Sequence, residues 1–259
     1  MLLLLSPAKT MDPRTPELPQ LRNAMSTPTW LTEATDIVTT LKTWSLKETQ
    51  RQLGLSESLA MKVHTWHQAW KPESALAAGW TFRGDAFKSL DLPSVSPDIA
   101  IEAQRRLLIL HGVYGMLRPL DQFMPVRLEM AQRWCHDPAF KNMAGFWRNL
   151  LPTAVDLAAQ KAAPSGLILN LASAEYGEVA LSGVPKERVA TCVFLERRNG
   201  QLKSISSLAK TARGAMARSV LSHKWTTPDE LHGFQELGYA LSTQDSTSNK
   251  KVFIRPWEA

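Results

Sequence analysis

The chain contains very little cysteine. Cys135 and Cys192 are its two cysteines in 259 residues, and neither belongs to a CxxC pair. A disulfide framework needs several cysteines, and structural zinc sites are usually built on CxxC pairs. The sequence therefore predicts two isolated, buried thiols and no structural metal.

Long apolar runs are also missing. The run Leu2–Leu5 ends at Ser6-Pro7 and follows no basic residue, so it is too short for a signal peptide. No other stretch is long and apolar enough to span a bilayer. Internal repeats and low-complexity linkers are absent as well. We therefore expect a cytoplasmic monomer without membrane contact, folded as a single domain over residues 1–259.

The common signatures of catalysis are absent. The segment that follows Leu2–Leu5 carries Lys9, but it lacks the glycines of a phosphate-cradling loop. Neither an HExxH pair nor a nucleophile elbow occurs. The sequence thus favours a binding protein over an enzyme, and it predicts no cofactor and no metal.

Acidic residues are fewer than basic ones. The chain has 30 Lys and Arg against 24 Asp and Glu, which gives a net charge of +6 and a pI near 9.4. Such a charge makes a polyanionic partner plausible. The imbalance is greatest between Glu196 and Trp225, where Glu196 is the only acid and the Lys and Arg residues are Arg197, Arg198, Lys203, Lys210, Arg213, Arg218 and Lys224.

Ser207–Leu221, within this basic region, has the pattern of an amphipathic helix. Lys210, Arg213 and Arg218 fall on the face away from the apolar positions. Gly214 lies among them, and glycine inside a helix costs about 1 kcal/mol relative to alanine. A closely approaching group would explain it. We favour a helix that faces phosphate, and the alternative is a solvated basic face with one tolerated glycine.

The stretch from Leu110 to Met130 combines glycine, aromatic, arginine and carboxylate residues. Gly112 and Gly115 allow a turn or a close backbone approach, and Pro119 biases Arg118 towards an extended conformation. Residues 126–130 alternate apolar and charged, which predicts a strand with Arg127 and Glu129 on one face. We interpret the stretch as the floor of a functional cleft. The alternative is an edge strand with solvated charges.

Other patterns predict a mixed β-sheet flanked by helices. Leu2–Leu5 and Leu167–Leu171 have the composition of buried strands, and Asn199-Gly200 marks a tight hairpin. A helix is predicted from Ser96-Pro97 to about His111, and a strand-like aromatic alternation at Trp80–Phe87. We therefore expect an α/β fold that uses the whole chain.

Residues 46–70 have the layout of a helix-hairpin-helix, in which amides at the start of the second helix can hold a DNA phosphate. The residues that define it are Gly54, Leu55, Ser56, Leu59 and Lys62. An ordinary helical hairpin would have a similar sequence. His64 and His67 are spaced to share a metal, but with no third ligand nearby we expect them to be exposed histidines.

These motifs together resemble the YaaA family of bacterial peroxide-stress proteins, nearly end to end. The matching segments are Leu5–Asp12, Phe82–Asp85, Val113–Asp121, Arg127–Met130, Asn170–Ser173, Glu175-Tyr176, Ala212–Gly214 and Gly233-Phe234. Their order and spacing carry the resemblance, because no single motif decides it.

The resemblance implies a positively charged cleft and a helix-hairpin-helix that bind double-stranded DNA, with lower free intracellular iron and less DNA damage under peroxide. The DNA-binding residues that match family positions are Lys9, Arg83, Arg118, Arg127 and Arg213. Lys210 and Arg218 rest on the helix pattern instead. Ser58 stands where a lysine is often found, Val126 where a tyrosine is usual and Ala174 where an aspartate is usual.

An enzyme acting on nucleic acid or a nucleotide is the alternative. Asp85, Glu129 and Glu175 could then serve as acid, base or metal ligands. Carboxylates among arginines also form ordinary salt bridges. The other polar candidates for the cleft are Tyr114, Asn170, Ser173 and Tyr176. Direct iron sequestration is a third possibility, but the six histidines and two cysteines form no ligand cluster in the sequence.

Overall fold

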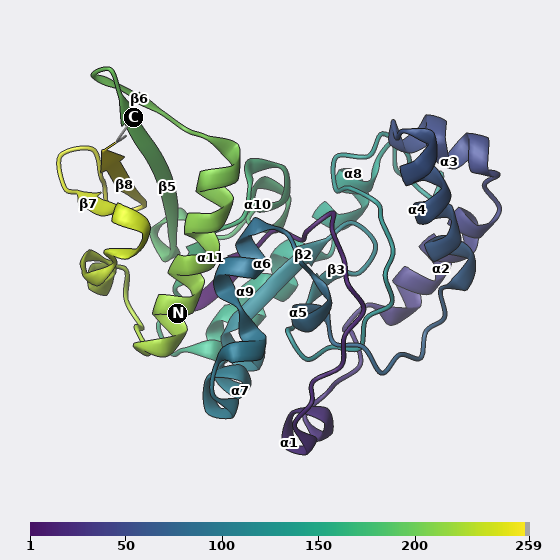
Figure 1. Cartoon of the computed structure of the whole chain (residues 1–259), viewed down its shortest axis with the longest axis horizontal. Helices are drawn as coiled ribbons and strands as arrows, with labels where there is room; N and C mark the ends of the chain where they lie inside the picture. Colours follow the sequence, from purple (N-terminus) through teal and green to yellow (C-terminus); the bar gives the residue numbers. More distant parts are fainter. Residues whose placement is uncertain (257–259) are drawn as a thin grey trace.

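The computed structural model describes residues 1–256 and has a mixed β-sheet at its centre (Figure 1). The strand order is β3-β2-β1-β4-β5-β8-β7, and β6 pairs with β5 outside this path. β1 pairs in parallel with both β2 and β4, so it lies inside the sheet. The strands are β1 (Leu2–Leu5), β2 (Leu107–His111), β3 (Gly115–Leu117), β4 (Ile168–Asn170), β5 (Val189–Arg198), β6 (Gln201–Lys203), β7 (Ala240–Ser242) and β8 (Lys250–Pro256).

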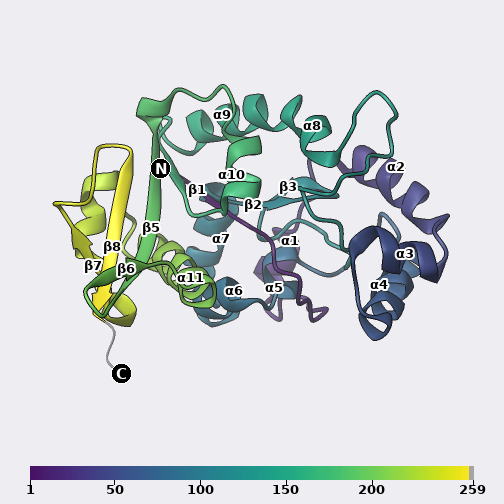
Figure 2. The same ribbon diagram turned by 90° about the horizontal axis from the view of Figure 1, so that it is seen from above.

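Helices cover both faces of this sheet (Figure 2). One face carries α8 (Met143–Arg148), α9 (Leu151–Ala162) and α10 (Ala174–Ala180), and the other carries α6 (Asp85–Leu90), α7 (Pro97–Arg106) and α11 (Ser206–Ser222). The remaining helices are α1 (Pro19–Asn23), α2 (Leu31–Lys42), α3 (Leu46–Leu53), α4 (Glu57–Ala69), α5 (Ala78–Thr81) and the 3-10 helices η1 (Leu92–Ser94), η2 (Lys186–Arg188), η3 (Pro228–Gly233) and η4 (Glu236–Gly238).

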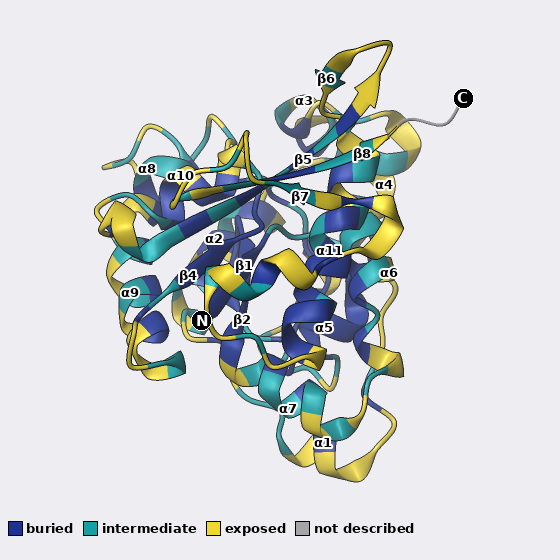
Figure 3. Cartoon of the chain, turned by 90° about the vertical axis from the view of Figure 1, so that its left-hand side faces the viewer, coloured by how far each residue is buried: buried dark blue, intermediate teal, exposed yellow. Residues whose placement is uncertain are grey.

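The burial of the strands follows from this layering. All four leucines of β1 are buried, because a parallel strand between two helix layers has no solvent face. Most of β5 instead alternates buried and half-buried positions. Figure 3 shows the buried positions in dark blue at the centre, with the exposed β5–β6 hairpin projecting from the molecule. None of the described helices is long and apolar enough to cross a membrane.

The predicted α/β class with a mixed sheet is confirmed. β1, β4 and α11 lie where the sequence predicted them. The hairpin at Asn199-Gly200 also forms, and both residues have positive φ, as a type I′ turn requires.

Two element predictions between residues 80 and 111 are wrong. The helix that starts at Pro97 ends at Arg106, and residues 107–111 form β2. A run of consecutive apolar residues does not distinguish a buried helix from a buried strand, so only the pairing with β1 decides it. The strand predicted at Trp80–Phe87 is replaced by α5 and the start of α6.

The expectation of two buried thiols holds for Cys192, whereas Cys135 is partly exposed.

Candidate functional site

A cavity of about 300 Å³ lies where β1 and β4 end. The carboxyl ends of parallel strands are the usual position of ligand sites in α/β sheets. The loop after β1, the start of α6, the extended segment 126–129, the start of α10 and one face of α11 all contribute to its wall. The predicted site residues that line it are Lys9, Asp85, Arg127, Glu129, Ser173, Glu175, Tyr176, Lys210 and Arg213.

Glu129 is the centre of an ion cluster at this cavity. Its Oε1 accepts hydrogen bonds from Arg127 Nε at 3.1 Å and Arg127 Nη2 at 3.0 Å, and Lys9 Nζ lies 3.1 Å away. The Arg127 side chain is 11% exposed and that of Lys9 is 68% exposed. The Arg127 pair is therefore the stronger of the two, since solvent screens the Lys9 pair.

The segment that carries this pair is extended, but it belongs to no strand of the described sheet, so the predicted strand at 126–130 is wrong. The alternation is nevertheless present: Val126, Leu128 and Met130 are buried, while Arg127 and Glu129 are half-buried. Two contacts hold it in place. His67 Nε2 lies 3.2 Å from the Arg127 carbonyl oxygen, and a Cβ on Gly112 would overlap the Leu128 carbonyl oxygen.

Arg213 reaches the same cavity from α11 without a counter-charge. Its Nε is buried and has no hydrogen-bond partner among the described residues. Burial lowers the pKa of its guanidinium, and the nearby Cys192 acts in the opposite direction. Lys210, almost one turn earlier, is exposed. A mostly buried cation without a partner is costly, and an anion in the cavity would compensate it.

Gly214 has a structural explanation. A Cβ at this position would overlap the backbone of Ala86, so α11 and α6 meet at van der Waals distance there. The close approach that the sequence predicted is confirmed, but the approaching group is a helix of the same chain. This packing also places Asp85, at the start of α6, on the cavity wall.

Three predicted arginines lie outside the cavity lining. Arg118 Nη1 donates to the carbonyl oxygens of Gln104 at 2.9 Å and Arg105 at 3.3 Å, at the end of α7. Arg218 Nη1 donates to the Leu90 and Asp91 carbonyls at 3.0 Å, at the end of α6. Both thus satisfy helix C-termini, which favour cations.

Arg83, the third of these arginines, pairs loosely with Asp12 at 3.8 Å. A DNA contact by Arg83, Arg118 or Arg218 stays a prediction. Because Arg118 binds carbonyls at the end of α7 and does not line the cavity, it does not form part of the cleft floor that the sequence predicted at residues 110–130.

Tyr114 and Asn170 have structural hydrogen bonds. The buried Tyr114 hydroxyl accepts from Trp70 Nε1 at 2.8 Å and from the Met124 amide at 3.3 Å, and burial raises the pKa of Tyr114 to about 12. Asn170 Oδ1 accepts from the Ala172 amide at 3.0 Å and so fixes the turn after β4. Neither residue lines the cavity.

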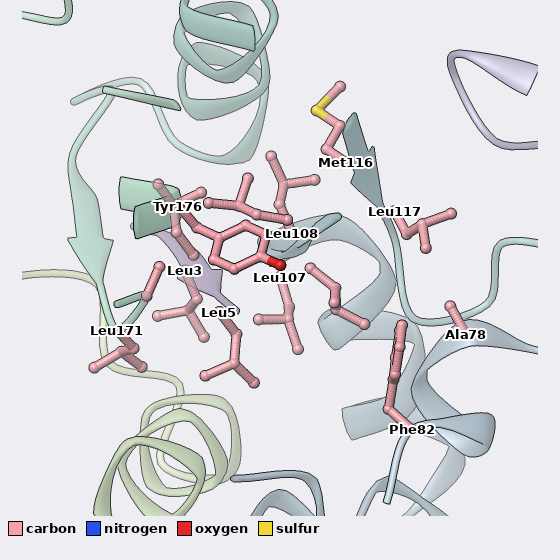
Figure 4. Packing of buried hydrophobic residues seen from close by; sticks show 14 of the residues in the cluster. Leu3, Leu5, Ala78, Phe82, Leu107, Leu108, Met116, Leu117, Leu171 and Tyr176 are labelled. Atoms are coloured by element: carbon pink, nitrogen blue, oxygen red, sulfur yellow. The ribbon is translucent and has the colours of Figure 1, made fainter. Parts of the chain in front are cut away.

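The polar residues after β4 do reach the cavity. Ser173 donates its amide to Ser6 Oγ at 2.8 Å, which ties the ends of β1 and β4 together. Glu175 Oε1 accepts from the Ala131 amide at 3.0 Å. Burial, and then the charge of Glu175, raise the pKa of Tyr176, whose ring lies beside Leu3 and Leu5 in Figure 4. Tyr176 is therefore neutral at physiological pH.

His111 lines the cavity too, and it was not among the predicted site residues. Its Nδ1 accepts from the amides of Val113 at 3.1 Å and Tyr114 at 3.3 Å. Burial lowers its pKa to about 3, so the ring is neutral. The residue ends a buried strand directly before Gly112, and polar residues at strand ends were the available signal.

The helical hairpin exists as two helices joined by a tight turn. Gly54 ends α3 in the left-handed conformation, with φ of 61°, and Ser56 precedes α4. Leu55 and Leu59 pack against the core, and Lys62 Nζ lies 4.9 Å from the centre of the Trp66 ring. DNA binding by this hairpin stays a prediction.

The expectation of exposed histidines on α4 is wrong for His67. It is buried, and burial lowers its pKa to about 4. The apolar face of α4 packs inward, so a histidine on that face is covered. No group of three or more His, Cys, Asp or Glu side chains in residues 1–256 is arranged to hold a metal ion.

Comparison with known proteins assigns the family. A family model described as peroxide stress protein YaaA matches residues 1–245. A UPF0246 protein of Shewanella baltica (strain OS185) is 35% identical, over 98% of this chain and 99% of its own length. A UPF0246 protein of Paracidovorax citrulli (strain AAC00-1) is 38% identical, over 98% of both chains. The chain therefore belongs to the YaaA family of peroxide stress proteins.

Proposed function

We propose that this peroxide stress protein binds double-stranded DNA by contacting the phosphate backbone of the DNA and by recognising the shape of the duplex. The observation that carries the proposal is the gathering of Lys9, Arg127, Lys210 and Arg213, from three distant segments, around one cavity. Arg213 forms no ion pair with any described carboxylate, and Lys210 is exposed. Phosphate contacts of this kind supply most sequence-independent DNA affinity.

The helical hairpin supports the same proposal because it is attached to the cleft. His67 of α4 bonds the carbonyl of Arg127, and Gln132 Nε2 donates to the Gln52 carbonyl of α3 at 2.8 Å. The start of α4 is exposed, and its free amides can donate hydrogen bonds to a phosphate. A duplex could then contact the hairpin and the cationic cavity mouth together.

A titration of a fluorescently labelled duplex over a salt series tests the proposal. Affinity should fall steeply with salt, with a slope of about −0.9 per phosphate contact. Lys210→Ala should reduce that slope by about one contact and weaken binding to all sequences alike. Lys161→Ala is the matched control, because this exposed lysine lies in the last turn of α9, before β4 begins and away from the cavity. Duplex binding that is absent or insensitive to salt contradicts the proposal.

The lower free iron and reduced DNA damage implied by the family resemblance belong to the same proposal. Binding along DNA is the activity that the described side chains support better, since they provide no metal-binding cluster. Metal analysis of the purified protein tests direct sequestration. Stoichiometric iron would favour sequestration over an indirect effect.

An enzymatic role has one specific observation in its favour. Asp85, Glu129 and Glu175 all line the cavity, and the Asp85 carboxylate has no hydrogen bond or ion pair with another described residue. The two hydrogen bonds that Arg127 donates to Glu129 Oε1 instead suit an orienting role for Glu129. If Glu129→Gln abolished a turnover on nucleic acid while sparing duplex affinity, the enzymatic role would be supported.

A further inference from the structure

The cavity has features that play no part in contacts with the phosphate backbone of a duplex. At about 300 Å³ it is at the lower end of the range for small-molecule sites, and a duplex is far too wide to enter it. Leu5, Phe87 and Leu171 form apolar parts of its wall. Leu5 ends β1 and Leu171 directly follows β4, and the Leu171 amide donates to the Leu4 carbonyl at 2.9 Å (Figure 4). The cavity therefore suits a small ligand with an apolar face.

The charged side chains of the cavity wall indicate which polar groups such a ligand carries. Arg213 presents a guanidinium with a buried, unpartnered Nε, which calls for an anionic group. The Asp85 carboxylate has no partner among the described residues, and the exposed Glu175 accepts from the Ala131 amide with one oxygen. Ionised carboxylates only accept hydrogen bonds, so both can accept from N–H donors of a ligand. Phosphate alone lacks both the apolar face and such donors.

We propose that the cavity receives a single nucleotide. Arg213 binds its phosphate, Leu5, Phe87 and Leu171 contact the face of its base, and Asp85 and Glu175 accept hydrogen bonds from N–H groups on the base edge. The nucleotide comes either from the free pool or from a DNA strand by extrusion. Extrusion rests on the proposed duplex binding, which would deliver the strand to the cavity mouth.

Extrusion of the nucleotide from a DNA strand is tested with a duplex that carries 2-aminopurine at a central mispair, where extrusion costs least. Stacking quenches this base, so at saturating protein its emission should rise by about threefold or more. Ser173→Phe, which places a bulky ring on the cavity wall, should abolish the rise. Ser222→Phe, at the exposed end of α11, is the matched control and should keep it.

Calorimetric titration of the full chain with dAMP and with deoxyadenosine tests whether the cavity binds nucleotides from the free pool. The wild-type chain should bind dAMP about tenfold more tightly than the nucleoside, and Arg213→Gln should remove that difference. Binding of dAMP with no emission change from the duplex assigns the site to free nucleotides. An emission rise in the duplex assigns it to the strand.

The nucleotide site and the DNA-binding proposal can fail separately. Salt-dependent duplex binding with neither an emission rise nor dAMP binding overturns the nucleotide site and leaves DNA binding intact. Binding of dAMP by a chain that does not bind duplex supports the nucleotide site and contradicts the DNA-binding proposal.

Discussion

Arg127 and Arg213 line the same cavity, but their charges are compensated differently. Arg127 is held by two hydrogen bonds to Glu129. Arg213 has no such partner in the described chain, and burial lowers the pKa of its guanidinium. Folding therefore gains from the Arg127 pair and is opposed by the burial of Arg213. A residue that costs stability and faces a cavity is typical of a ligand contact.

Replacing each arginine by methionine should change stability in opposite directions. Arg213→Met should raise the free energy of unfolding by about 1 kcal/mol, because an uncompensated charge leaves the interior. Arg127→Met should lower it by roughly 1–3 kcal/mol, because Glu129 loses its partner. Urea denaturation followed by tryptophan fluorescence measures both. A loss of stability in Arg213→Met as large as in Arg127→Met would refute the contrast.

At the scale of elements, the contact between α11 and α6 shapes one wall of the cavity. Gly214 lets the two backbones meet, and the same face of α11 presents Lys210 and Arg213. The glycine therefore positions α6 and, through it, Asp85. It is not itself a contact for a phosphate.

Gly214→Ala should destabilise the fold although alanine favours helices. Alanine gains about 1 kcal/mol in helix propensity, but the overlap with Ala86 forces the helices apart at a cost of roughly 1–3 kcal/mol. Thermal unfolding should therefore show a lower midpoint, whereas Ser222→Ala, at the exposed end of the same helix, should leave it nearly unchanged. An unchanged or higher midpoint for Gly214→Ala would show that the helices separate without cost.

The start of α4 allows a gain-of-function prediction. Ser58 is exposed in the first turn, beside the amides that would hold a phosphate. Ser58→Lys should tighten duplex binding and steepen its salt slope by about 0.9, the value for one added phosphate contact. Ser165→Lys, in the loop that precedes β4 and away from the cavity, is the matched control. Equal effects of the two lysines would mean that net charge, and not the hairpin, determines affinity.

At the scale of the whole molecule, the core contains ionisable groups held neutral by burial. The pKa of His67 falls to about 4 and that of His111 to about 3. Between these values and the usual 6.5, the unfolded chain binds protons that the folded chain does not, so acid destabilises the fold. Buried Asp121 acts in the opposite sense, because burial raises its pKa to about 6 and the folded state takes up its proton first.

His67→Gln should make stability less sensitive to acid. Between pH 6 and pH 4.5 the wild-type chain should lose about 1.1 kcal/mol per pH unit more than the variant, which is the effect of most of one proton. Urea denaturation at several pH values measures the two slopes. Parallel slopes would show that His67 titrates normally in the folded chain.

The sequence predicted elements better than side-chain partners. β1, β4, α11 and the Asn199-Gly200 hairpin were predicted from periodicity and turn residues, which are local properties. β2 was missed because its strand identity depends on pairing with β1, more than a hundred residues earlier. Nine predicted site residues line the cavity, but Arg118 and Arg218 bind the ends of helices instead.

The sequence by itself determined the family, the α/β class and the set of residue types available to the site, because motifs, periodicity and charge are properties of the linear sequence. Tertiary structure alone decided which arginine is paired, why position 214 is glycine and which carboxylates share a cavity. These outcomes depend on distances between segments far apart in the sequence. Burial then sets the energy of each charge, and burial exists only once the layers have packed.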